Sequence, residues 1–294
     1  RAIVRRMDGL LENVGVEALS IANIEHPGET WESGDYRKAS TPGFDVHSSF
    51  LVNMREVYNS WISDIHSYQP PGNSSTSHLL SNGIRVSRSF QVTVRNCALR
   101  RPQYGGGGGN GYMYQLIHVN ECLLTNCLAE FSRHGFSLSL AGSSGNVFLR
   151  CEDRETQRAT GHTGSYVTSG AGSDNHMHFS HSNLWDSCHA HNSFWSAHHR
   201  GKSGSIPHAL SSALSVFWNT SGSGTRYPVI VLSEQAGYGY VIGTSGEAHE
   251  ACNPTGGNTA PADILEGIGE GATLEPRSLY LDQLQRRLSI GIGR

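Results

Sequence analysis

Histidine and arginine gather in two short segments of this chain. Residues 130–136 read Glu-Phe-Ser-Arg-His-Gly-Phe, and residues 174–179 read Asp-Asn-His-Met-His-Phe. A neutral imidazole can accept a proton near pH 7, and an arginine can neutralise a carboxylate. Glycosidases generally need two carboxylates about 5–10 Å apart, and these segments offer few. The pattern therefore favours β-elimination from a uronic-acid polymer, in which a base removes the proton alpha to the sugar carboxylate.

Individual residues can be given roles in such a reaction. His134 is predicted to be the base, and Arg133, with His176 and His178, is predicted to bind or neutralise the substrate carboxylate. Because His176 and His178 are two apart on an expected strand, their side chains should point the same way. Further residues predicted to bind the substrate are Arg85, Gln115, Glu130, His199, Arg200, Lys202 and His208.

Other interpretations of the same residues stay open. A glycoside hydrolase could use carboxylates such as Glu130 and Asp174. A divalent metal ion could bind His176 and His178 together with a third histidine, although β-elimination by these residues needs no cofactor. The protein could also be a non-catalytic surface or assembly protein that only binds glycans. The expected partner of the lyase is an acidic polysaccharide.

Both segments lie within a repeat that runs through most of the chain. Four cysteines hold the same place in a short phrase, and four other residues extend its register at intervals of 24 to 41 residues. In chain order this row is Ile24, Ile65, Cys97, Cys127, Cys151, Cys188, Thr220 and Thr244. The residues three positions earlier are Ile21, Ile62, Val94, Leu124, Phe148, Trp185, Phe217 and Val241. Repeats of 20–50 residues are typical of stacked units, so the members of the first row from Ile24 to Thr220 should face inward on successive coils.

The strands of each repeat are short, β-branched or aromatic, and separated by Gly, Ser and Asn. A second strand is expected before each core phrase, at 50–52, 84–86, 112–114, 136–138 and 177–179. Helical periodicity is almost absent before residue 276. We therefore predict an all-β fold, a right-handed parallel β-helix of about eight coils. Long loops at 26–47, 69–80, 100–110, 155–175 and 198–208 should line one side of the solenoid and form a groove suited to a polymer.

The solenoid is expected to span residues 1–262, followed by a tail at 263–294. In the tail, Pro276 should open an amphipathic helix that packs on the solenoid through Leu281, Leu284 and Leu288. The first coil begins almost at once and would expose an unpaired edge. We therefore expect an N-terminal cap, domain or fragment of the same precursor upstream of residue 1.

Composition limits the classes of partner. Charged residues make up 16% of the chain and the formal net charge is −3, so no basic field predicts nucleic-acid binding. No apolar run approaches the roughly 20 residues that cross a membrane. The aligned cysteines are expected to be a buried ladder of free thiols, with a Cys97–Cys127 or Cys122–Cys127 disulfide as the alternative.

Four phrases resemble a group of secreted, pectate-lyase-like β-helix proteins from microbes. They are Asn-Val-Gly-Val-Glu at 13–17, Arg-His-Gly-Phe at 133–136, His-His-Arg at 198–200 and Val-Phe-Trp-Asn at 216–219. The corresponding motifs in that group more often read Arg-His-Asp-Phe and His-His-Arg-Trp, where this chain has Gly135 and Gly201. The resemblance implies a carbohydrate-active β-helix, an extracellular location, and a functional role for Arg133, His134, His199 and Arg200.

Overall fold

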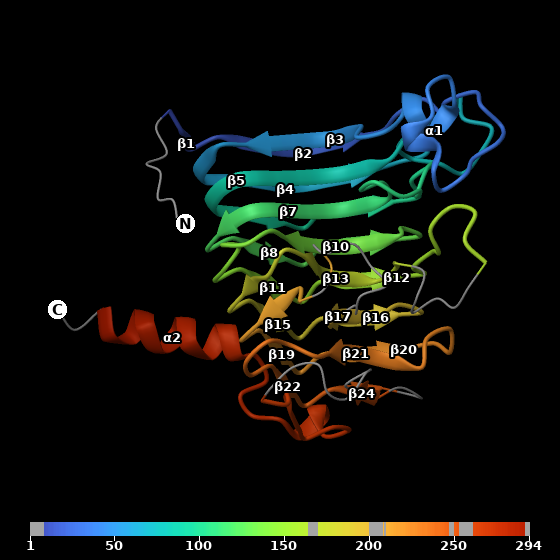
Figure 1. Cartoon of the computed structure of the whole chain (residues 1–294). Coiled ribbons are helices and arrows are strands. Elements are labelled where there is room, and N and C mark those ends of the chain that lie inside the picture. The colour runs from blue at the N-terminus through green and yellow to red at the C-terminus, as the bar shows by residue number, and fades with distance from the viewer. Residues whose placement is uncertain are drawn as a thin grey trace, which may run out of the picture.

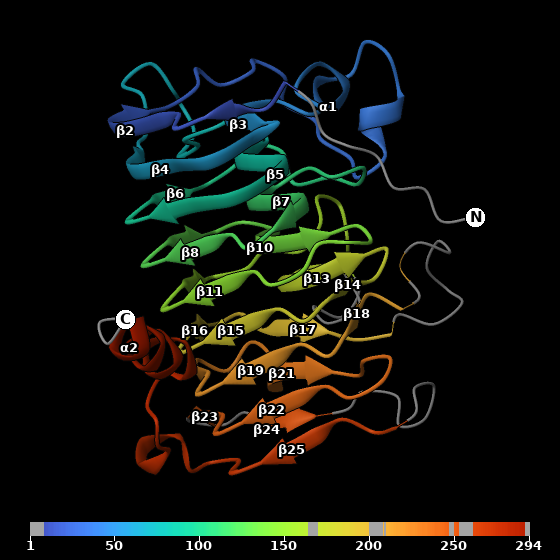
Figure 2. The same cartoon turned by 90° about the vertical axis from the view of Figure 1, so that its left-hand side faces the viewer.

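The computed structural model describes residues 9–163, 170–199, 208, 210–246, 250–252 and 261–291. These residues form a parallel β-helix, in which the chain coils from β1 at one end to β25 at the other (Figures 1 and 2). Every strand pairing among them is parallel and joins one coil to the next. The prediction of an all-β parallel solenoid with a short C-terminal helix is confirmed.

Three ladders of stacked strands make the sides of the solenoid. The first ladder comprises β3 (Phe50–Arg55), β5 (Asn82–Arg95), β7 (Tyr112–Asn120), β10 (His134–Ser139), β13 (Ser173–Met177), β17 (Trp195–Ala197), β21 (Val229–Ser233) and β24 (Glu250–Cys252). Long strands such as β5 continue around a corner into the second ladder. Between these two ladders, β14 (Ser180–His181) pairs with β18 (Ser212–Ala213).

The second ladder carries the apolar row of the repeat. It comprises β1 (Leu11–Glu12), β2 (Gly15–Ile21), β4 (Val57–Ser67), β8 (Leu123–Thr125), β11 (Val147–Leu149), β15 (Leu184–Asp186), β19 (Val216–Trp218), β22 (Tyr240–Ile242) and β25 (Ile264–Glu266). The third ladder comprises β6 (Ala98–Arg100), β9 (Leu128–Glu130), β12 (Glu152–Arg154), β16 (His189–His191), β20 (Ser221–Ser223) and β23 (Ser245–Gly246).

The helices lie outside the ladders. A short 3-10 helix, Asp35–Arg37, and α1 (Pro42–Asp45) belong to the first long loop, and a second 3-10 helix, Gly271–Thr273, follows β25. Because β25 still pairs with β22, the solenoid extends four residues beyond the boundary expected at 262. Among the described helices, none is long and apolar enough to cross a membrane.

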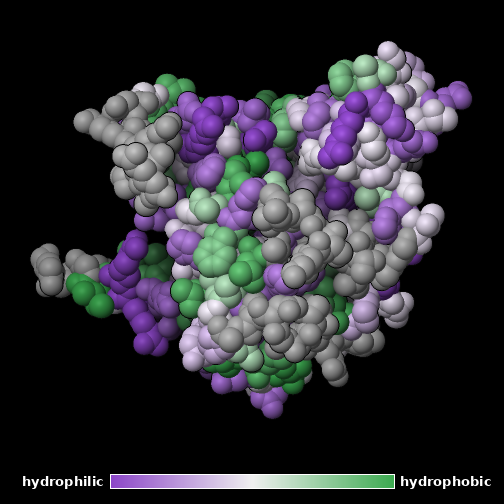
Figure 3. All heavy atoms as spheres, in the orientation of Figure 1, coloured by the Kyte–Doolittle hydropathy of each residue, from purple (hydrophilic) through white to green (hydrophobic). Residues whose placement is uncertain are grey.

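The C-terminal helix α2 (Leu279–Gly291) is fixed to the solenoid at its first turn. Buried Asp186 accepts hydrogen bonds from the Ser278 hydroxyl at 2.8 Å and from the Tyr280 N–H at 2.7 Å. The Ser278 hydroxyl also accepts from the Leu281 N–H, so the helix begins after Ser278 and not at Pro276 as expected. Beyond this turn the helix stands away from the body (Figures 1 and 3), and Leu288 is 57% exposed.

The apolar row of the second ladder forms the centre of the core. Ile62 pairs with Val94, and the register then continues coil by coil to Val241. All seven side chains from Ile62 to Val241 are buried. The Phe148 and Trp185 rings stack with centroids 3.8 Å apart. This part of the predicted repeat is confirmed, and it makes each coil depend on its neighbours for burial.

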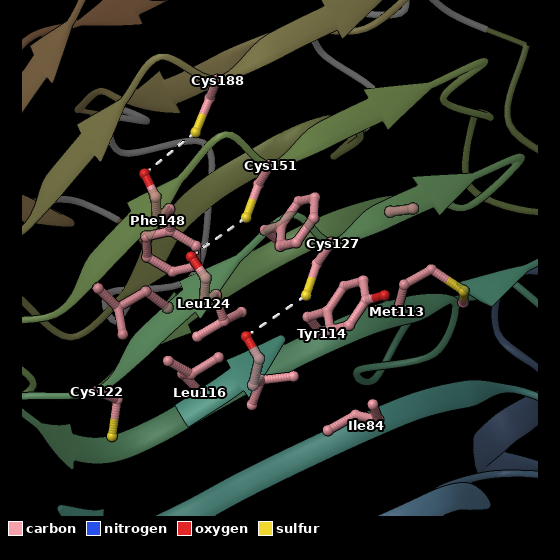
Figure 4. Close-up of a cluster of buried hydrophobic side chains, with 14 of the residues drawn as sticks. Ile84, Met113, Tyr114, Leu116, Cys122, Leu124, Cys127, Phe148, Cys151 and Cys188 are labelled. Carbon is pink, nitrogen blue, oxygen red and sulfur yellow. Dashed lines mark hydrogen bonds between the residues drawn. The ribbon is translucent and has the colours of Figure 1, made fainter. Parts of the chain in front are cut away.

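The cysteine row is buried beside that core. Cys97, Cys122, Cys127, Cys151 and Cys188 are free thiols, so neither alternative disulfide forms. Three thiols donate to the carbonyl of a core residue on the preceding coil: Cys127 to Val94 at 3.6 Å, Cys151 to Leu124 at 3.5 Å and Cys188 to Phe148 at 3.2 Å (Figure 4). A small apolar side chain with a weak donor suits this position.

The residue before each position of the inward row explains the repeated phrase. Asp64, Asn96, Asn126, Arg150, Ser187 and Asn219 all have left-handed backbone, with φ between 49° and 56°. Asparagine and aspartate tolerate this conformation better than most residues. The amide of Asn126 also donates to the Asn96 side chain at 3.5 Å. The phrase therefore marks a sharp corner that repeats on every coil.

The first coil differs from the predicted alignment. Val16 pairs with Ile62, and Leu19 pairs with Ile65, whereas Ile24 lies beyond β2 and is 67% exposed. The expected place of Ile24 in the inward row is therefore wrong by five residues. The sequence offers two apolar pairs with the same spacing here, and the Asn-Cys phrase that fixes the later coils is missing.

Candidate functional site

A cleft of about 510 Å³ lies on the first ladder beside the long loops. Described residues of three loops meet beside it, since the Gly107 N–H donates to the Ser33 carbonyl and the Thr160 N–H donates to the Gly105 carbonyl. The cleft walls include Tyr36, Arg37, Phe50, Arg85, Tyr112, Gln115, Arg133, His176, Met177 and His208. The structure thus brings together five of the predicted site residues: Arg85, Gln115, Arg133, His176 and His208.

A hydrogen-bonded chain of three side chains ends at this cleft. Nδ1 of His176 lies 2.8 Å from a carboxylate oxygen of Asp174, and Nε2 of His176 lies 3.1 Å from the Tyr112 hydroxyl. An ionised carboxylate can only accept hydrogen bonds, so Nδ1 of His176 carries the proton and Nε2 offers its lone pair towards Tyr112. Asp174 is fully buried, and His176 is 6% exposed. A carboxylate that orients an imidazole in this way prepares it for proton transfer.

His134 lies behind this chain and not on the cleft wall. Its side chain is fully buried and stacks on the Tyr112 ring, with centroids 4.5 Å apart. Its Nδ1 donates to the Gly172 carbonyl at 2.7 Å. A solvent-facing base at His134 is therefore wrong. The neighbouring Gly135 explains the tight packing, because a Cβ there would lie 2.5 Å from the carboxyl carbon of Asp153.

Two arginines at the cleft have different surroundings. Arg133 donates to the carbonyls of Gly170 at 2.8 Å and Gly106 at 2.6 Å, which fixes its guanidinium between two loops. The Arg85 guanidinium lies 5.2 Å from the Phe50 ring centre, and its buried Nε has no hydrogen-bond partner among the described residues. Burial, with repulsion from neighbouring arginines, lowers the pKa of Arg85 below its usual value. Arginine still keeps its charge at neutral pH, so Arg85 is a half-buried cation suited to an anionic ligand.

His178 does not share the direction of His176. Strand β13 ends at Met177, and its register with β10 shifts between Leu138 and Ser139. His178 follows with a φ of 59° and is exposed. Before this bulge Ser137 pairs with Asp174 and Leu138 with Asn175, so the expected equivalence of segments 136–138 and 177–179 is wrong. Strict alternation fails wherever a bulge adds a residue.

Glu130 lies in a different cavity, on the third ladder. It pairs with Arg100 at 2.8 Å, and the cavity of about 370 Å³ around it is lined by Glu130, Glu152, Arg154, Glu155, His189 and His191. The predicted placement of Glu130 in the histidine cleft is therefore wrong. His199 is half-buried and is not part of the described cleft wall, and Arg200 and Lys202 lie outside the described residues.

Tyr112 is the functional candidate that sequence reasoning missed. It stands opposite His134 in the β7–β10 pairing, which became clear only once the register was fixed. The sequence pattern predicts Asp174 only as a hydrolase carboxylate, although its spacing of two residues from His176 on a strand is a signal for an oriented imidazole.

His134, Asp174 and His176 form a buried group whose nearest nitrogen and oxygen atoms lie within 4.8 Å of one another. Such a set could hold a metal ion. However, Nδ1 of both histidines already donates, one to Gly172 and the other to Asp174. We therefore interpret this group as a hydrogen-bonded support for Tyr112 and His176. Comparison of the chain with protein-family models, curated proteins and solved structures found no match.

Proposed function

We propose that this protein is a secreted polysaccharide lyase that cleaves a uronic-acid-containing polysaccharide by β-elimination in the cleft. The hydrogen-bonded chain from Asp174 through His176 to the Tyr112 hydroxyl carries the proposal. It ends on a wall that also includes Arg85 and Arg133. A proton-transfer group beside fixed cations matches what the removal of a proton alpha to a carboxylate requires.

The reaction can be written with two of these side chains. Nε2 of His176 removes the proton alpha to the substrate carboxylate. The electron pair of that bond forms a carbon–carbon double bond, and the bond from the neighbouring carbon to the glycosidic oxygen breaks. The Tyr112 hydroxyl protonates the leaving oxygen. The proton on His176 then passes to the Tyr112 oxygen across their 3.1 Å hydrogen bond, which restores both groups.

Arg85 is the proposed partner of the substrate carboxylate. Its Nε is buried without a hydrogen-bond partner among the described residues, and it makes no ion pair with their carboxylates. Gln115 stands opposite Arg85 on the next coil and also lines the cleft. Arg133 is held by two carbonyls and contributes a fixed positive charge. Binding the carboxylate there would stabilise the charge that develops on it as the proton leaves.

The positions of the carboxylates favour elimination over hydrolysis. Hydrolysis generally needs two carboxyl groups facing one bond. The described residues of the cleft wall include no aspartate or glutamate, and Asp174 lies behind His176. Glu130, the other hydrolase candidate, lines the cavity on the third ladder. Secretion is part of the proposal because the sequence resembles secreted proteins and an acidic polysaccharide is an extracellular polymer.

The test is incubation with a panel of acidic polysaccharides while ultraviolet absorbance from an unsaturated uronate product is followed. Loss of a positioned base typically costs about 10²–10⁴ in rate, so His176→Ala should lose activity by that factor. His178→Ala is the matched control, because His178 is exposed and outside the cleft wall. New reducing ends without absorbance would instead indicate hydrolysis, and binding with neither signal would indicate a non-catalytic glycan-binding protein.

A further inference from the structure

Three possible metal ligands meet where the hydrogen-bonded chain reaches the cleft. Nε2 of His176 lies 3.2 Å from Nε2 of His208 and 3.1 Å from the Tyr112 hydroxyl oxygen. The two imidazole rings meet edge to face, with centroids 4.9 Å apart. His208 is half-buried and lines the cleft, so solvent can reach this point.

Two neighbours share the Nε2 atom of His176. His176 donates its Nδ1 proton to Asp174, so its Nε2 has a single lone pair to offer. That lone pair faces both the Tyr112 hydroxyl and Nε2 of His208. One acceptor position is therefore shared by two neighbours at hydrogen-bond distance. A cation placed between the two imidazoles would satisfy both nitrogen lone pairs at once.

The separations suit a zinc ion. Zinc binds imidazole nitrogen at about 2.0–2.1 Å with tetrahedral geometry, so two ligand atoms on one ion lie about 3.3 Å apart. The distance between the two Nε2 atoms is 3.2 Å. Metal-binding histidines commonly donate their other ring N–H to a carboxylate, as His176 does to Asp174. Imidazole ligands favour zinc, copper and nickel, whereas Mg²⁺ and Ca²⁺ prefer oxygen ligands.

We propose that His176 and His208 bind one zinc ion through their Nε2 atoms at the cleft wall. Asp174 orients His176 from behind, and the Tyr112 oxygen or water completes the coordination. This site differs from the buried group of His134, Asp174 and His176, because the ion is held by the opposite nitrogen of His176. Zinc binding here does not depend on lyase activity. If both proposals hold, zinc inhibits the lyase, since the ion occupies the nitrogen that acts as base.

The test is titration of the purified, metal-stripped chain with Zn²⁺ by calorimetry, with Mg²⁺ in a parallel titration. One Zn²⁺ should bind per chain, and Mg²⁺ should not bind at this site. His208→Ala should lower the zinc affinity at least tenfold, and loss of the supporting carboxylate in Asp174→Asn should lower it by about 10–100-fold. His208 is half-buried at the cleft wall, and circular dichroism of each variant checks that the fold is kept.

His178→Ala and His191→Ala are the matched controls. His178 is exposed next to β13, and His191 lies on the third ladder with Glu155 3.4 Å from its ring nitrogen, so it could attract zinc independently. Both variants should retain the affinity of the unmodified chain. X-ray absorption of the zinc-loaded chain should show nitrogen or oxygen ligands at about 2.0–2.1 Å. Zinc affinity that is unchanged in His208→Ala, or lost in His191→Ala, would overturn the proposal, and so would the absence of zinc binding.

Discussion

Asp153 should make the stability of the solenoid depend on pH. Its side chain is fully buried and accepts hydrogen bonds from Ser173 at 2.6 Å, from Ser193 at 2.7 Å and from Thr156 at 3.2 Å. Burial outweighs these hydrogen bonds and raises the pKa of Asp153 to about 6. The charge of nearby Asp174 acts in the same direction. The fold therefore favours the protonated form of Asp153.

The magnitude follows from the difference between the folded and unfolded pKa values. The ordinary value is 3.8 and the folded value is about 6, and each unit corresponds to about 1.4 kcal/mol. Protonated Asp153 should therefore stabilise the fold by about 3 kcal/mol relative to the ionised form. This stabilisation is fully present below pH 3.8. As the pH rises from about 4 to 6 the unfolded chain releases its proton first, so the stabilisation is lost, and above that range the free energy of unfolding no longer changes through this group.

Asp153→Asn removes the titration while it keeps the size of the side chain. The hydroxyls of Ser173, Ser193 and Thr156 can rotate to accept from the new amide or to donate to its oxygen. Urea denaturation from pH 4 to pH 7 should show that the variant loses less stability across this range than the unmodified chain, by up to about 3 kcal/mol. Asp64→Asn is the control, because asparagine occupies the equivalent corner on the next two coils.

Equal pH dependence in the unmodified chain and in Asp153→Asn would refute this reasoning. It would mean that Asp153 titrates similarly in the folded and unfolded states, or that water reaches it. A variant that loses more stability at pH 7 than at pH 4, relative to the unmodified chain, would also contradict it. In that case the hydrogen bonds to the ionised carboxylate would outweigh the cost of burying its charge.

Two further predictions concern the cleft and the corners. Arg85→Gln should raise KM for an acidic polysaccharide about tenfold or more, because a charge-assisted hydrogen bond is worth about 1.5–3 kcal/mol, and it should leave the thermal transition nearly unchanged. Steady-state kinetics would measure the change in KM, with Arg88→Gln as the control. An unchanged KM would exclude Arg85 from substrate binding. Asn126 has a φ of 52°, so Asn126→Val should lower the free energy of unfolding by about 1–2 kcal/mol in urea denaturation. Asn126→Gly should leave it nearly unchanged. Equal decreases in both variants would instead indicate that the lost side-chain hydrogen bonds between coils are responsible.

The sequence predicts this fold well where one phrase fixes both a corner and the core. The corner has left-handed backbone, which asparagine and aspartate tolerate best, and the following residue must fit inside the coil. Together they fix the register from Ile65 to Thr244. The first coil lacks this phrase, and two apolar pairs with equal spacing, Val16 with Leu19 and Ile21 with Ile24, fit the pattern equally well. Hydrophobic spacing alone cannot choose between them.

The candidate site was harder to predict because it depends on register and on burial. Arg85 and Gln115 were correctly placed in one cleft, since both follow from the regular part of the first ladder. The bulge near Met177 shifted the alignment of the histidines, so His176 and His178 no longer face the same way. The full burial of His134 depends on its contacts with Tyr112 and Gly172, which a sequence pattern does not contain.

The two proposed proton-transfer residues, Tyr112 and His176, come from coils that are two apart, and the buried His134 lies on the coil between them. Tyr112 lies on β7, His134 on β10 and His176 on β13, and each strand pairs with the next. His176 lies further along its strand than the position beside His134, because Asp174 pairs with Ser137. Tyr112 and His176 are therefore not neighbours at the backbone, and only long side chains can bring them together. The His134 ring fills the space between, stacked on Tyr112 and edge-on to His176. In the proposed reaction, His134 is thus a positioning residue that supports the Tyr112 hydroxyl within hydrogen-bond distance of His176.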